Sequence, residues 1–245
     1  MPNLTRRHSL ALLAAAALLS SAAQAETVTG SGHMVSENRA VAAFEAVALE
    51  GSFSVKVRQG SREALELRAD DNLLPLIETE VENRSGRSTL VLRWKRSTSV
   101  RDSGNIVISV EARTLRALSA AGSGTIEAEA IEGDRLALAV AGSGDLRVGR
   151  VSVDDLQASV AGSGDIRAGG SAAAVKLSIA GSGDVDLAGV EAEQVKVSIA
   201  GSGDASVTAH QSLSVSIAGS GDVRYGGRVQ TVKRSIVGSG DVQRR

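Results

Sequence analysis

Apolar and polar residues alternate before each of seven Gly-Ser-Gly triplets, the first of which begins at Gly122. The residue four positions before each triplet is apolar in six of the seven copies, and the residue three positions before it is Ser in six copies. The residue two positions before each triplet is always apolar: Ala120, Val140, Val160, Ile179, Ile199, Ile217 and Ile236. Alternation with a period of two predicts a β-strand that buries one face.

The alternation resumes after each triplet. In six of the seven copies the next residue is Asp, and the first copy has Thr125 instead. An apolar residue follows directly: Ile126, Leu146, Ile166, Val185, Ala205, Val223 and Val242. A polar residue and then a second apolar residue come next in most copies. Each repeat is therefore predicted to be a strand, a corner and a second strand.

The triplets recur every 18 to 20 residues, beginning at Gly122, Gly142, Gly162, Gly181, Gly201, Gly219 and Gly238. A fixed period near twenty with glycine corners is typical of a solenoid. Stacked coils would place equivalent residues about 4.8 Å apart and would cover the apolar face of every strand. We therefore predict an all-β fold, a right-handed parallel β-helix (solenoid) with coils of about 20 residues. An antiparallel sandwich would also contain many short strands, but it does not require a constant period.

The segment before the first triplet is less regular. Residues 26–39 are predicted to be a flexible lead-in, and residues 40–121 to form irregular coils of the same β-helix. With the regular repeats of 122–245, residues 40–245 would be a single domain. A separate N-terminal sandwich is the alternative. Asp70-Asp71-Asn72, shortly before Pro75, indicates a single capped helical turn.

Residues 1–25 are typical of a secretory signal peptide. Arg6 and Arg7 precede an apolar run, and Ala23-Gln24-Ala25 is a suitable cleavage site. The apolar run is too short for a stable membrane span, and we expect no other span. The chain is therefore predicted to be exported to the periplasm, the extracellular space or the cell surface. The pair of arginines leaves both the general secretory route and the twin-arginine route open.

Composition excludes several classes of protein. The formal net charge is −1 for the whole chain and becomes −3 when Arg6 and Arg7 leave with the signal peptide. This balance favours neither nucleic acid nor an anionic membrane as partner. The chain has no cysteine, which excludes disulfides. Aromatic residues are rare, whereas sugar-binding clefts usually rely on aromatic platforms.

The Asp residues after the corners are the clearest candidate site. Stacking would place carboxylates from neighbouring coils about 5 Å apart, where they repel each other unless something offsets the charge. Calcium could do so, because it takes several oxygen ligands. Alternatively, each Asp caps its own corner through backbone N–H groups, with Arg147, Arg167 and Arg224 moderating the repulsion. The candidate calcium ligands are Asp145, Asp165, Asp184, Asp204, Asp222 and Asp241.

A polysaccharide-active enzyme is a further alternative, because β-helices host lyases and hydrolases that use carboxylate clusters. The adjacent acidic pairs are Asp70-Asp71 and Asp154-Asp155, and both are also typical of turns. His33 and His210 accompany no metal-binding or catalytic motif. Fold alone does not establish an activity, so no catalytic residue is predicted.

Three sequence features together resemble a known family. They are the segment from Phe44 to Val57, the Asp-Asn-Leu-Leu run from Asp71 to Leu74, and the serial Ser-x-Ala-Gly-Ser-Gly-Asp corners. This combination is similar to the head GIN domain family of bacterial secreted proteins, a domain of unknown function labelled a putative auto-transporter adhesin. The resemblance covers roughly residues 40–245. It implies a β-helical protein of the cell envelope and suggests adhesion, and it brings no catalytic or ligand-binding residues.

The sequence thus predicts a non-catalytic β-helix module of the cell envelope that is adhesin-like or structural. Its partner would be an envelope or surface ligand that the sequence does not identify. The alternatives are a calcium-binding solenoid and a polysaccharide-active enzyme. No cofactor is expected, although calcium stays open, and no catalytic, cofactor or metal residue is assigned beyond the Asp candidates named above.

Overall fold

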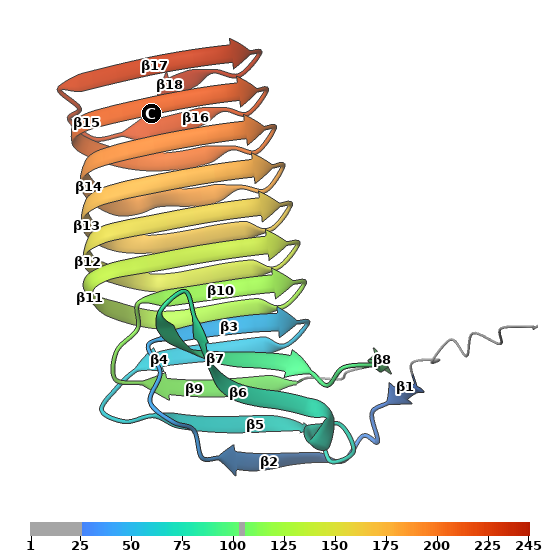
Figure 1. Ribbon diagram of the computed structural model, residues 1–245. Helices are drawn as coiled ribbons and strands as arrows, with labels where there is room; N and C mark the ends of the chain where they lie inside the picture. The colour runs from blue at the N-terminus through green and yellow to red at the C-terminus, as the bar shows by residue number, and fades with distance from the viewer. Residues whose placement is uncertain (1–25, 103–105) are drawn as a thin grey trace, which may run out of the picture.

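The regular part of the protein is a β-solenoid in which consecutive coils stack as parallel strands (Figure 1). The structure is a computed structural model that describes residues 26–102 and 106–245. The prediction of a parallel solenoid is confirmed, with about six turns and coils of about 20 residues. The expected signal peptide, residues 1–25, lies outside the described residues.

Each coil of the regular part contains one long, bent strand. The strand that leaves one corner continues into the strand that enters the next, so the two predicted strands are one element. These elements are β11 (Thr125–Gly142), β12 (Asp145–Gly162), β13 (Asp165–Gly181), β14 (Val185–Gly201) and β15 (Ala205–Gly219). Register shifts between Val148 and Val151, and between Arg167 and Gly169, interrupt the pairing midway along the strands. The ribbon turns there from one face of the solenoid to the other (Figure 1).

Shorter strands complete the stack at both ends. They are β10 (Ala117–Gly122) before β11, and β16 (Val223–Gly226), β17 (Thr231–Gly238) and β18 (Val242–Arg244) after β15. All of them pair in parallel with their neighbours. Equivalent positions of successive coils therefore lie side by side, one strand spacing apart.

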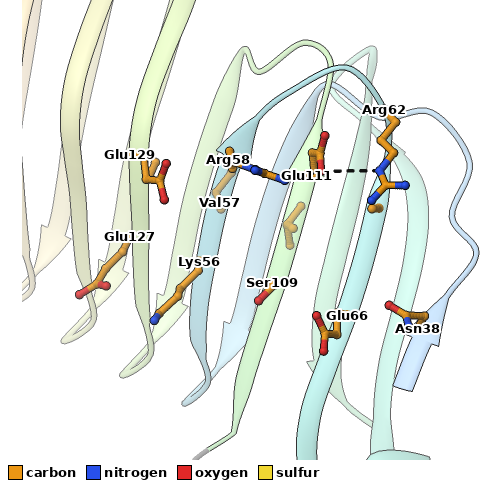
Figure 2. Close-up of a pocket in the computed structure, with 13 residues that line it drawn as sticks. Asn38, Lys56, Val57, Arg58, Arg62, Glu66, Ser109, Glu111, Glu127 and Glu129 are labelled. Carbon is orange, nitrogen blue, oxygen red and sulfur yellow. Dashed lines mark hydrogen bonds and ion pairs between the residues drawn. The ribbon is translucent and has the colours of Figure 1, made fainter. Parts of the chain in front are cut away.

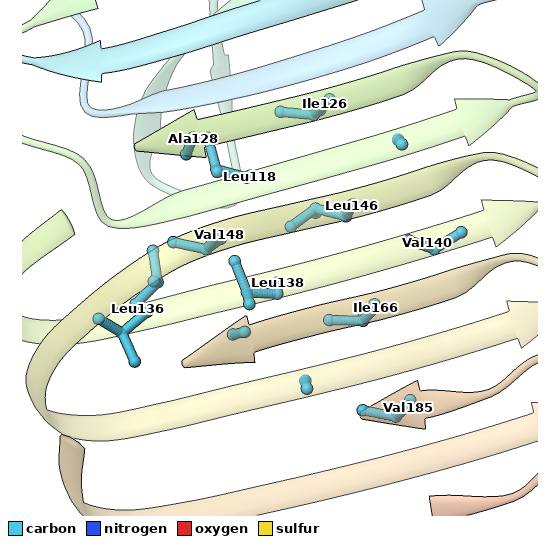
Figure 3. Packing of buried hydrophobic residues seen from close by; sticks show 14 of the residues in the cluster. Leu118, Ile126, Ala128, Leu136, Leu138, Val140, Leu146, Val148, Ile166 and Val185 are labelled. Atoms are coloured by element: carbon cyan, nitrogen blue, oxygen red, sulfur yellow. The ribbon is translucent and has the colours of Figure 1, made fainter. Parts of the chain in front are cut away.

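Aliphatic side chains fill the interior in ladders (Figure 3). Leu118 lies in register with Leu138, and Ile126 with Leu146. These four side chains are at most 1% exposed. At about 25 cal/mol per Å² of apolar surface removed from water, such ladders are the main favourable contribution to stability. The interior is filled by the protein's own side chains.

Glycine is required at the corners because successive coils approach each other closely there. Gly201 has a φ of 136°, which L-residues with a side chain rarely adopt. A Cβ atom on Gly201 would overlap the carbonyl oxygen of Gly181 in the coil below. The same carbonyl accepts a hydrogen bond from the backbone N–H of Ser202 (2.8 Å). The corner is therefore a contact between two backbones.

The N-terminal part shares its sheet with the regular coils. Strands β3 (Ala46–Gly51), β4 (Ser54–Gln59), β7 (Arg87–Trp94) and β9 (Val107–Ala112) add parallel strands to the stack. Three others pair antiparallel: β2 (Met34–Arg39), β5 (Ala64–Asp70) and β6 (Ile77–Arg84). This part therefore departs from regular coils at its outer end but continues the same sheet.

Residues 26–39 form strands rather than the flexible lead-in predicted from the sequence. They contain β1 (Glu26–Thr29), which pairs with β8 (Thr98–Asp102), and β2, which pairs with β5. Ser31 anchors the connection between them, because its hydroxyl donates to the Asp71 carboxylate. The expected single helical turn is present as the 3₁₀ turn η1 (Leu74–Leu76), but its N-cap residue is Leu73, so the expected side-chain cap is not formed.

Replacing a corner glycine should destabilise the solenoid far more than replacing a glycine elsewhere in the same coils. We expect Gly201→Ala to lower the free energy of unfolding by roughly 2–4 kcal/mol, because it adds backbone strain and overlap with the next coil. Urea unfolding followed by circular dichroism measures this change.

Gly189→Ala is the matched control. A Cβ atom on Gly189 would be 3.4 Å from the Gly169 Cα, which is ordinary contact, so a change within about 1 kcal/mol is expected. Equal effects of the two substitutions would contradict the role assigned to the corner.

Candidate functional site

The Asp residues form a ladder along one edge of the solenoid, but they do not cap their own corners as the sequence suggested. The Asp184 backbone N–H donates to the Asp165 carboxylate (3.1 Å). The backbone N–H groups of Asp204, Asp222 and Asp241 donate in the same way to the Asp carboxylate of the preceding coil. The distance from nitrogen to oxygen is 2.9 Å in each case. Only the Asp241 carboxylate also accepts from the residue that follows it, Val242 (2.6 Å), among the corners that the structure describes. The ladder therefore links coils to one another.

Arginines offset part of the charge of this ladder. Arg147 pairs with Asp145 (2.8 Å), and Arg167 lies 3.4 Å from Asp165. Arg224 and Arg167 also line a small depression of about 180 Å³ beside the ladder, together with Asp165, Asp184 and Asp204. The expected moderating role of these arginines thus has a geometric basis.

A cation at this edge would have to be held by the Asp residues that line the depression. In residues 26–102 and 106–245, no group of three or more His, Cys, Asp or Glu side chains has an arrangement that could hold a metal ion. One oxygen of each carboxylate from Asp165 to Asp222 already accepts a backbone N–H. Calcium binding by this ladder therefore stays a prediction from the sequence.

An open groove of about 630 Å³ lies beside strands β4, β9 and β11, where the irregular and regular parts meet (Figure 2). Its wall carries charges of both signs. The cations are Lys56, Arg58 and Arg62, and the carboxylates are Glu66, Glu111, Glu127 and Glu129. Lys56 lies in register with Glu127 on the neighbouring strand. Such a lining can bind an ionic ligand by charge and hydrogen bonds.

Glu111 is the centre of the charge pairing in this groove. It accepts from Arg58 (2.7 Å) and lies 3.7 Å from Arg62. Partial burial raises its pKa, but the Arg58 hydrogen bond and the charges of Arg58 and Arg62 outweigh this, so the pKa of Glu111 is lowered. A carboxyl group in this setting is ionised at neutral pH and is unsuited to act as a general acid.

The sequence did not reveal the groove, because its residues come from segments between Asn38 and Glu129. No motif links these segments, and their proximity depends on how β4, β5 and β9 pair.

One face of the regular coils, called the flat face below, carries two columns of small side chains near the corners. Two columns of outward residues lie in register from coil to coil. One column contains Ser119, Ala139, Ser159, Ser178, Ser198, Ser216 and Ser235, and the other contains Ala121, Ala141, Ala161, Ala180, Ala200, Ala218 and Val237. The residues of the second column are all exposed, and those of the first are exposed or half-buried. The face offers a regular array of hydroxyl groups next to a smooth apolar strip.

The carboxylate pairs considered for catalysis are not assembled into one site. Asp70 is buried and accepts the Gly32 N–H (3.2 Å). The Ser31 hydroxyl lowers the pKa of Asp71 by donating to it. At the other pair, Asp155 forms an ion pair with Arg135 (3.2 Å). The His210 ring contacts the Glu191 carboxylate on the neighbouring coil. His33 lies in the connection between β1 and β2, so the two histidines do not belong to one site.

These observations define a repeat-built solenoid that presents regular, largely polar surfaces. The chain belongs to the family described as "Putative auto-transporter adhesin, head GIN domain", whose model matches residues 43–229. The family resemblance predicted from the corners is thus confirmed. No curated protein matches the chain.

Several solved structures share the fold. A putative adhesin from Bacteroides fragilis has a TM-score of 0.82 at 22% sequence identity, covering 89% of this chain and all of that one. A putative adhesin from Parabacteroides distasonis has a TM-score of 0.70 at 25% identity, covering 90% and 100%. A putative lipid binding protein from Parabacteroides distasonis has a TM-score of 0.74 at 24% identity, with the same coverage. At these identities the similarity establishes the fold.

Among residues 26–102 and 106–245, no helix is long and apolar enough to cross a membrane.

The hydrogen bonds between Asp residues can be separated from their charge by substitution. Asp204→Asn keeps an oxygen that accepts the Asp222 N–H and removes repulsion within the ladder, so stability should change by no more than about 0.5 kcal/mol. Asp204→Ala removes the acceptor and should lower the free energy of unfolding by about 1 kcal/mol. Urea unfolding of both variants tests this expectation.

The same variants distinguish a calcium site. If the ladder binds calcium, the unfolding temperature of the native chain should rise with added calcium and fall on chelation, and Asp204→Asn should weaken this response. An unfolding curve that does not respond to calcium or to a chelator would remove the calcium hypothesis.

Proposed function

We propose that the chain is a non-catalytic binding module of the cell envelope that contacts another surface through its flat face. The observation that carries this proposal is the in-register array of outward Ser and Ala residues over the regular coils. Small side chains in register make a smooth strip along the corner side of this face, which can meet a second extended surface over a long distance. The family description points the same way, since it names an adhesin.

The enzyme hypothesis has less support. The acidic pairs that suggested it are held in local hydrogen bonds or ion pairs at separate places in the fold. The charged groove at Glu111 contains a carboxylate that is kept ionised by two arginines. These arrangements favour binding over proton transfer, and the fold alone does not argue for catalysis.

Export is part of the proposal and rests on the features of residues 1–25 given above. Treating intact cells with protease should cleave the protein if the solenoid is outside the cell, as detected with an antibody to residues 40–245. A lysed sample is the control for cleavage itself. Protection until lysis would place the module in the periplasm and remove the role in binding outside the cell.

Substituting larger side chains on the flat face tests whether this face binds cells. Beads coated with the protein should be retained on intact cells of the producing bacterium. The variant Ser178→Gln with Ser198→Gln places two longer neutral side chains on the flat face and should reduce this retention several-fold. The matched control, Ser152→Gln with Ser171→Gln, changes two exposed serines that are likewise in register on adjacent coils, but on another side of the solenoid. Equal retention of both variants would overturn the assignment of the flat face, and no retention of the unmodified protein would overturn the binding function.

A further inference from the structure

A third column of outward side chains, several of them long and polar, lies beside the Ser column on the flat face. Its members occupy the fifth position before each corner, and they pair in register from strand to strand. They are Ala117, Ala137, Gln157, Lys176, Lys196, Ser214 and Lys233. Three cations therefore stand in one line, with Lys176 and Lys196 on adjacent strands and Lys233 two strands further on.

The two adjacent lysines have no neutralising partner among the residues that the structure describes. Lys176 lies directly opposite Lys196, at a strand spacing of about 4.8 Å, and like charges in this arrangement are destabilising. Neither lysine forms an ion pair with any residue of the described ranges, whereas the nearby Asp155 is already paired with Arg135 (3.2 Å). On the other face of the coils, Arg147 is paired with Asp145 (2.8 Å). The lysines are thus a source of uncompensated positive charge.

These lysines stand at a shallow hollow of about 510 Å³ in the flat face. Lys176, Lys196, Gln157 and Gln194 provide long side chains around it, as does the ion pair of Arg135 with Asp155 at its edge, and Ala174, Ser212 and Ser214 are the short ones. The hollow forms where short side chains replace long ones in the columns that run along the stack. A ligand group placed here would meet ammonium, amide and hydroxyl donors together.

We propose that this line of cations binds an extended anionic polysaccharide that runs along the solenoid axis. The proposal rests on the function proposed above and names the ligand class of that face. Negative groups spaced along a chain match cations that recur in register, and the neighbouring Ser hydroxyls and Gln amides can bond to sugar hydroxyls.

The surroundings favour a polysaccharide over other anionic polymers. Single-stranded nucleic acids are bound largely by stacking on aromatic side chains, but Phe44, Phe53 and Tyr225 are buried in the core. Anionic membranes are recognised by clusters of about four to eight cations, more than this line provides. Recognition here therefore depends on a few charges and many neutral hydrogen-bonding groups.

Binding of defined polymers to the full mature chain tests the proposal. The probes are polygalacturonate, which carries carboxylates, and dextran sulfate, which carries sulfates, with methyl-esterified polygalacturonate and dextran as their neutral counterparts. We expect binding to at least one anionic polymer, weaker binding to its neutral counterpart, and a loss of affinity as salt is raised. The two anionic probes identify which acidic group is preferred.

A pair of charge-matched variants locates the site. Lys176→Gln with Lys196→Gln should weaken polymer binding by about five-fold or more, as expected from losing two ion pairs. Lys95→Gln with Arg96→Gln removes the same charge from two exposed residues after β7 and should leave affinity within about two-fold. Circular dichroism confirms that both variants are folded.

Equal weakening by the two variants, or no binding of either anionic polymer, would overturn the proposal. Preferential binding to polyglutamate or to anionic vesicles would also overturn it, in favour of an acidic peptide or a membrane. If the protein still adheres to cells through the flat face while these lysines have no effect, the ligand assignment fails and the proposed binding function stands. Loss of cell adhesion altogether would instead show that the binding function itself is wrong.

Discussion

The close contact between glycine backbones at the corners is the constraint on which the rest of the structure depends. At Gly201 and its equivalents, the backbone of one coil occupies the space that a side chain would need above the coil below. Because each corner glycine packs against the corner glycine of the preceding coil, the strands of every coil must begin at the equivalent position above the coil before it. The period of 18 to 20 residues is the length of chain needed to go once around the solenoid and reach the next corner. Register, and with it the identity of every ladder, follows from this contact.

Register in turn divides the surface into stripes of distinct chemistry. Inward positions repeat as aliphatic ladders, of which Leu118 over Leu138 is one example. On one outer face, Asp and Arg residues neutralise each other or bond to the next coil, as at Asp145 and Arg147. On the other, small residues make a flat surface beside unpaired lysines. A repeat protein needs only a substitution at one position of the repeat to place a functional group at a chosen point along its length.

The sequence predicted the features that depend on the repeat. The solenoid, its coil length and the inward ladders could all be predicted from counting positions relative to the glycines. Two kinds of feature could not be predicted. The pairing of β5 with β9 is antiparallel, but the alternation of Leu65 and Leu67 is the same for either strand direction. The Asp carboxylates bond to the next coil instead of their own corner, because a stacked backbone N–H lies within reach. Lys176 and Lys196 did have a visible signal, the fifth position before the corner. It becomes significant only when the structure shows that the nearby Asp155 is already paired with Arg135.

Removing one coil tests most directly whether the coil is the structural unit. Deleting residues 182–201 joins Gly181 to Ser202 and keeps the corner spacing, while deleting residues 182–191 removes half a coil and breaks it. Each coil contacts chiefly its neighbours, so we predict that the first deletion gives a folded, cooperatively unfolding solenoid of lower stability. The second should give a chain whose later coils are no longer protected from hydrogen exchange. If the whole-coil deletion fails to fold, or if the half-coil deletion is equally well protected, the corner contact does not determine the register and the account is wrong.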